Sequence, residues 1–175
     1  MLLGAAVLAC LALLPAGLAW GLPRNGIGVQ AGVVGHSFVQ PLVGGGERDF
    51  TSAGPSLAAD AQFVWSDRWS INPAVLFSPE KITGGNIEGE LVSYAALLQL
   101  RHWRENGYLG VHIGIFKQVI RTPRRTFDTG DGGFGFAAGW EGERGLLLGV
   151  QYDWERAITG ERIQALRAQI GYRWR

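Results

Sequence analysis

The sequence has a single cysteine, Cys10, and almost no net charge. One cysteine cannot pair within the chain, so a framework of disulfides is excluded as the source of stability. The formal net charge of +1 is far from the concentrated basic surface that phosphates attract, which argues against nucleic acid as a partner. Charged residues make up only 18% of the chain, and beyond the N-terminal apolar segment no helical periodicity occurs.

Glycine and aromatic residues are abundant instead, with 27 Gly, 8 Phe and 7 Trp among 175 residues. Glycine without a three-residue period excludes a collagen-like chain, and the aromatics exclude a disordered linker. Glycine mixed with aromatics in short alternating runs is typical of a barrel of many strands. The length predicts one domain.

The first segment, residues 1–19, is apolar and ends just before Trp20. Small residues at Gly17 and Ala19 predict an export signal cut after Ala19, which leaves 20–175 as the mature domain. No charged residue precedes the apolar run, so two alternatives are a start further upstream and an uncleaved membrane helix. Val7-Leu8-Ala9-Cys10 loosely matches a lipoprotein cleavage box, but nine further apolar residues follow where a lipoprotein would become polar.

Eight stretches alternate bulky apolar residues with small or polar ones, as β-strands with two different faces do. They are 26–38, 57–66, 69–78, 89–104, 108–118, 133–141, 146–155 and the C-terminal stretch 165–175. Short turns at 66–68, 105–107 and 142–144 alternate with longer links at 40–55, 79–88, 120–131 and 156–161. This order predicts an all-β fold, an eight-stranded antiparallel up-and-down transmembrane β-barrel with long extracellular loops.

The two faces of the stretches predict how the barrel is oriented. The bulky face is almost free of charge, whereas the other face carries Gly, Ala, Ser, Gln and single charges. Lipid requires the first kind of surface, and a narrow lumen accommodates the second. A soluble lipocalin-like barrel, with an apolar interior around a ligand, is the alternative. Aromatic residues near strand ends predict interfacial girdles: Trp65, Trp69, Trp103, Tyr108, Trp140, Trp154, Tyr172 and Trp174.

The export segment, the eight stretches and the terminal Tyr172-Arg173-Trp174 resemble the small outer-membrane barrels of the OmpA/OmpX and opacity-protein kind, across nearly all of 26–175. The resemblance implies a monomer in the outer membrane of a Gram-negative bacterium. In that family a terminal aromatic on the last strand is read by the barrel-insertion machinery. Here Arg175 follows Trp174, so the aromatic is penultimate. The resemblance is one of pattern and fixes architecture better than activity.

Charged residues on the predicted inner face form a candidate lumen network. Its members are Asp60, Arg101, Glu141, Asp153, Glu155, Arg167 and Arg173, and His36 and His112 share the face. Because buried charges must be paired, we expect Arg167 to lie between Asp153 and a second acid, Glu141 or Asp60. The network predicts a polar plug that fills the lumen, with a narrow channel as the alternative.

A catalytic or metal site is not indicated. Some small outer-membrane barrels modify lipid A with a serine nucleophile and a histidine base, but adjacent His36 and Ser37 must point to opposite faces. Residues 130–135, GDGGFG, match a dinucleotide-binding pattern only in letters, because a strand follows instead of a helix. Asp128 and Asp131 are more typical of turns than of a calcium site. We therefore predict no enzyme, no cofactor and no metal.

Basic residues near the third long link predict the partner. Lys117, Arg121, Arg124 and Arg125 are candidates for contact with lipopolysaccharide phosphates, which arginine binds through two parallel hydrogen bonds. A solvated loop is the simpler interpretation. The predicted function is a structural or surface-interaction role at the cell surface, with outer-membrane lipid as the main environment.

Overall fold

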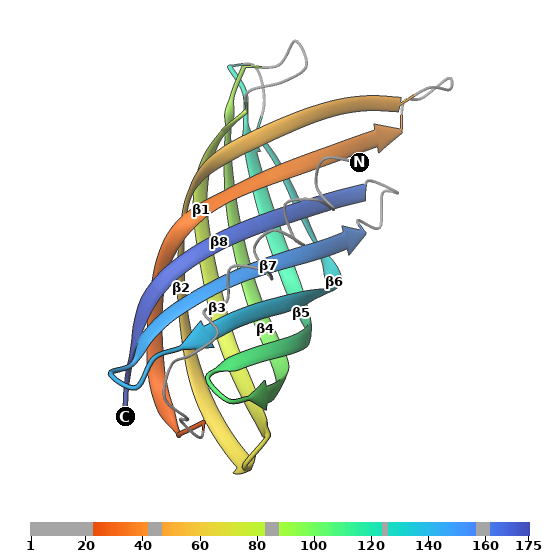
Figure 1. The fold of residues 1–175 in the computed structure, drawn as a ribbon. Coiled ribbons are helices and arrows are strands. Elements are labelled where there is room, and N and C mark those ends of the chain that lie inside the picture. Colours follow the sequence, from red (N-terminus) through yellow and green to blue (C-terminus); the bar gives the residue numbers. More distant parts are fainter. Residues whose placement is uncertain (1–22, 42–46, 83–87, 124–125, 157–161) are drawn as a thin grey trace.

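The eight stretches form a closed antiparallel barrel in which each strand pairs with its neighbours in sequence and β1 pairs with β8 (Figure 1). The computed structural model describes residues 23–41, 47–82, 88–123, 126–156 and 162–175, so the predicted export segment lies outside the described residues. Among the described residues, none belongs to a helix that is long and apolar enough to cross a membrane. The strands are β1 (Gly26–Pro41), β2 (Glu47–Ser66), β3 (Trp69–Ile82), β4 (Glu90–Arg104), β5 (Gly107–Arg121), β6 (Thr126–Glu141), β7 (Leu146–Arg156) and β8 (Arg162–Trp174).

The strands are longer than the sequence predicts. They have 11 to 20 residues, so much of what the sequence indicates as the long links 40–55, 79–88 and 120–131 belongs to strands. Their backbone pairing continues even where the apolar alternation stops, as it does around Gly54 and Pro55 of β2. The prediction of long links was therefore wrong over these ranges. The GDGGFG stretch likewise lies within β6, which places Asp128 and Asp131 on opposite sides of that strand.

One end of the barrel, which we call the turn end, carries the short connections and the C-terminus (Figure 1). Gly145 occupies one of these turns with φ +88°, a conformation that glycine adopts without strain. Its amide donates to Gly142 O at 2.8 Å, and its carbonyl accepts from Arg173 N at 2.7 Å. This turn therefore ties β6 and β7 to the end of β8.

Side chains alternate between the lumen and the outside along every strand, as the burial of β3 and β4 illustrates. Among the described residues, three clusters of buried apolar side chains occupy the lumen at successive heights. Phe38, Phe50, Ile82, Leu91 and Ile163 form the cluster at the end opposite the turns, which we call the loop end. Ala58, Ala74, Leu76, Ala95, Leu97 and Phe116 form the middle cluster, and Trp103, Tyr108 and Ala137 form the third.

Candidate functional site

The charged residues of the lumen divide into two networks, and the first lies near the turn end. This lower network consists of Asp60, Arg101, Glu141 and Arg173, all buried. Arg173 is its centre, with Nη2 at 2.5 Å from Asp60 Oδ2 and Nη1 at 2.6 Å from Glu141 Oε2. Arg101 Nη2 approaches the same Asp60 oxygen at 3.3 Å. Two acids thus face two arginines, so the charges of the lower network balance.

Polar side chains complete the lower network. Arg173 Nη1 donates to Gln62 Oε1 at 2.6 Å, and Asn72 Nδ2 donates to Asp60 Oδ2 at 3.2 Å. At the rim, Arg175 Nη2 reaches Glu141 Oε1 at 3.1 Å while its Nη1 donates to Glu143 O at 2.7 Å. The C-terminal arginine therefore joins β8 to the turn between β6 and β7.

The second network lies closer to the loop end. This upper network consists of Asp153, Glu155, Arg167, His112, Glu80 and His36, all buried. Asp153 forms an ion pair with Arg167, and its Oδ1 lies 2.7 Å from His112 Nε2. Glu80 Oε2 lies 2.7 Å from His36 Nδ1 and accepts from Ser52 Oγ at 2.7 Å. Glu155 accepts a hydrogen bond from Gln118.

The two networks differ in their balance of charge. The upper network has three carboxyl groups, those of Glu80, Asp153 and Glu155, and Arg167 is its one arginine. The middle apolar cluster lies between the networks along β2, β3 and β4, at Ala58, Leu76 and Ala95. Two glutamines nevertheless link the networks: Arg101 Nη2 donates to Gln99 Oε1 at 2.7 Å, and Gln99 Nε2 donates to Gln151 Oε1 at 3.3 Å. Gln151 Nε2 in turn donates to Asp153 Oδ1 at 2.7 Å. The cluster at the loop end then covers the upper network. In it the rings of Phe38 and Phe50 stack with their centroids 4.5 Å apart.

The predicted lumen residues all face the interior, but not all of their expected pairs occur. The pairing of Arg167 with Asp153 is present. The second acid expected for Arg167 was wrong, because Asp60 and Glu141 both bind Arg173 instead. Sequence analysis also missed Glu80, which the expected link 79–88 concealed although it shares the inward parity of β3.

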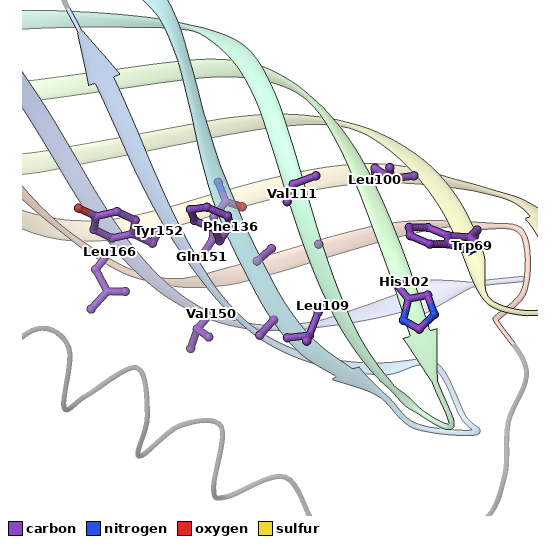
Figure 2. Close-up of a pocket in the computed structure, with 13 residues that line it drawn as sticks. Trp69, Leu100, His102, Leu109, Val111, Phe136, Val150, Gln151, Tyr152 and Leu166 are labelled. Atoms are coloured by element: carbon purple, nitrogen blue, oxygen red, sulfur yellow. The ribbon is translucent and has the colours of Figure 1, made fainter.

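The outer face is apolar and exposed. Ile115 is 71% exposed and Ile113 64%, whereas Arg167 in the lumen is 1% exposed. Figure 2 shows one part of this face, where Leu109, Phe136 and Tyr152 lie on neighbouring strands. Burying charge and exposing apolar side chains is the reverse of a soluble protein and is what a barrel in lipid requires.

Six of the eight residues predicted for the aromatic girdle face the outside of the barrel. Trp65, Trp69, Trp154, Tyr172 and Trp174 are exposed, and Trp140 of the outer face is partly exposed.

Trp103 and Tyr108, by contrast, point into the lumen with 2% and 7% exposure, so their assignment to the girdle was wrong. Trp103 Nε1 donates to Ser70 Oγ at 2.8 Å, and the Tyr108 ring lies under the Arg101 guanidinium at 4.4 Å. Both aromatic side chains therefore close the lumen at the turn end and lie beside the lower network.

The candidate lipopolysaccharide residues are described only in part. Lys117 and Arg121 are exposed on the outward side of β5, and Lys117 Nζ lies 3.8 Å from Asp128 Oδ2. Arg124 and Arg125 lie outside the described residues. Within the described ranges, no group of three or more His, Cys, Asp or Glu side chains could hold a metal ion.

Comparison with solved structures identifies the fold. Ail, the attachment invasion locus protein of Yersinia pestis, matches with a TM-score of 0.59 and 10% identity. The match covers 87% of this chain and 100% of that one. Neisserial surface protein A matches with a TM-score of 0.56 and 15% identity over 84% of this chain and 95% of that one. The outer membrane protein OprG from Pseudomonas aeruginosa matches with a TM-score of 0.52 and 9% identity over 88% of this chain and 98% of that one. No protein-family model and no curated protein matches the sequence. The chain thus has the fold of the small eight-stranded outer-membrane β-barrels, as predicted.

Proposed function

We propose that this chain is a bacterial outer-membrane barrel with a structural or surface-interaction role and a lumen closed by its own side chains. The observation that carries the proposal is the distribution of charge. Long apolar side chains cover the outside, and the ionic residues lie inside in hydrogen-bonded networks. The fold shared with Ail, Neisserial surface protein A and OprG supports the same location.

Packing of the lumen favours a plug over a channel. A void beside Asp60 and Gln99 has a volume of about 10 Å³, which is room for about one water molecule. The apolar cluster at the loop end adds side chains that cannot replace the hydration shell of an ion. We therefore expect no sustained ion current through the native barrel.

The test of location uses residues 20–175 refolded into detergent micelles. We expect β-sheet circular dichroism and a gel mobility that changes on heating. A chain that stays soluble and monomeric without detergent, and that binds a hydrophobic ligand inside, would establish the lipocalin-like alternative.

The partner we propose at the loop end is lipopolysaccharide, held through phosphate by Lys117, Arg121, Arg124 and Arg125. Exposure of Lys117 and Arg121 on β5 supports the proposal. Changing all four residues to Gln should reduce the lipopolysaccharide that copurifies with the barrel, whereas Arg68→Gln at the turn end should not. Equal amounts in both variants would refute the contact.

We also propose that the barrel has no catalytic centre. The lumen histidines His36 and His112 are each 2% exposed, so a lipid substrate outside the barrel cannot reach their rings, and the outward-facing Ser37 cannot reach the His36 ring. Mass spectrometry of lipid A from cells with and without the protein should give the same acyl chains. A reproducible gain or loss of one chain would establish the enzyme alternative.

A further inference from the structure

Arginine recurs at the turn end of the barrel, once for each connection. Arg68, Arg104 and Arg144 belong to or border the three short turns, and Arg24 precedes β1 on the same rim. All four are exposed. Within the described part of the chain, none of the four forms an ion pair, whereas Arg175 beside them is bound to Glu141 and Glu143.

Hydrogen bonds to the backbone carbonyls hold two of these arginines, Arg68 and Arg24, in place at the rim. Arg68 O accepts from Trp103 N at 2.7 Å, and Arg24 O accepts from Gln62 Nε2 at 3.0 Å. Asn25 Oδ1 accepts from Val64 N at 2.7 Å, which ties the segment before β1 to the end of β2. Because the four arginines belong to four different segments of the chain, they lie at separate positions around the end of the barrel.

Exposed aromatic rings lie at the same height. Trp65 is 57% exposed and stacks on Trp69, with the ring centroids 6.5 Å apart. Trp174, next to Arg175 in the chain, is 56% exposed. Exposed indoles at one level of a membrane barrel mark the boundary between hydrocarbon and headgroups. Arginines immediately beyond that boundary extend to the depth of lipid phosphates.

We propose that Arg24, Arg68, Arg104 and Arg144 form a ring that binds the phosphates of anionic phospholipid headgroups in the leaflet at the turn end. Charge complementarity supports this occupant, since the rim carries five arginines against three exposed acids, Asp67, Glu105 and Glu143. Separate positions around a circumference suit several small headgroups better than one polyanion in a single site. The inference rests on the proposed insertion in a membrane.

The test compares two matched variants in phosphatidylcholine vesicles with and without phosphatidylglycerol. The first, the turn-end variant, carries Arg68→Gln, Arg104→Gln and Arg144→Gln. Its control carries Arg68→Lys, Arg104→Lys and Arg144→Lys, which keep the positive charge at the same three positions. Phosphatidylglycerol should raise the folding equilibrium constant of the wild type and of the control. In the turn-end variant this rise in the equilibrium constant should be smaller by a factor of at least about ten. The reason is that each basic residue near an anionic surface increases such a constant about fivefold.

Four other outcomes are distinguishable. Equal loss of the gain in both variants would overturn the turn-end ring, and so would an unchanged gain in the turn-end variant. Binding of the detergent-solubilised barrel to peptidoglycan that the turn-end variant loses, without any effect of phosphatidylglycerol, would assign the arginines to a periplasmic polyanion instead. Failure of the wild type to enter either vesicle would contradict the proposed function itself.

Discussion

Replacing Arg167 by methionine removes the one arginine of the upper network. Arg167 is 1% exposed, pairs with Asp153 and lies within electrostatic reach of Glu80. Asp153 keeps its contacts with His112 and Gln151, each at 2.7 Å, but three buried carboxyl groups then lack a permanent cation. Breaking a buried ion pair costs about 3–5 kcal/mol, and we expect Arg167→Met near the top of that range.

Urea titration of the folded barrel in micelles measures this loss through tryptophan fluorescence. A barrel of this size has a denaturant dependence of about 2 kcal/mol per molar, so the midpoint should fall by about 2.5 M. Exposed Arg121→Met should shift it little, because surface changes stay within about 0.5 kcal/mol. Adding Glu155→Gln to Arg167→Met should restore part of the stability, since it removes one uncompensated acid.

The same variant separates a plug from a pore. Water in an open lumen would screen the charges, so Arg167→Met would leave the midpoint unchanged and alter the single-channel current. That pair of results would refute the closed lumen. A large loss of stability without any current supports it.

The number and order of the strands, and which side chains point into the lumen, could be predicted from the sequence. This is because lipid requires apolar side chains on one side of each strand, whereas the lumen holds small and polar side chains on the other. Parity along each strand carried that information, so Arg173 and Asp153 were assigned correctly to the inside. Parity also carried the correct answer for Trp103, which shares the inward face with Arg101. Proximity to a turn does not decide which side of the sheet a residue faces, so the girdle assignment of Trp103 was wrong.

Contacts between distant strands could not be predicted. Arg173 selects Asp60 and Glu141 because the closed barrel brings β2 and β6 to opposite sides of the β8 side chain across the lumen. Alternation within one strand does not define such distances, which depend on strand tilt and register. Glu80 illustrates a second limit, since beyond the lipid boundary the outward residues need not be apolar and a strand resembles a loop.

Three further changes test other parts of the barrel. Arg173→Met should cost less than Arg167→Met, about 2–3 kcal/mol by urea titration, because Asp60 and Glu141 each keep another arginine; an equal or larger cost would contradict the charge balance of the lower network. Ile113→Lys, in the middle of β5 and 64% exposed, should destabilise the barrel in bilayers by about 2–4 kcal/mol, whereas Ile113→Leu should not. A lysine tolerated there would mean that this face does not meet lipid. Gly145→Ala should cost about 2 kcal/mol, because φ is +88° and a Cβ would lie 2.3 Å from Arg173 O. Its effect should appear in the urea midpoint and as faster hydrogen exchange of the Arg173 amide, which Gly145 O accepts in the native turn. If exchange quickened equally throughout β8, the substitution would have loosened the whole barrel, and the local role of this turn in closing β8 would be wrong.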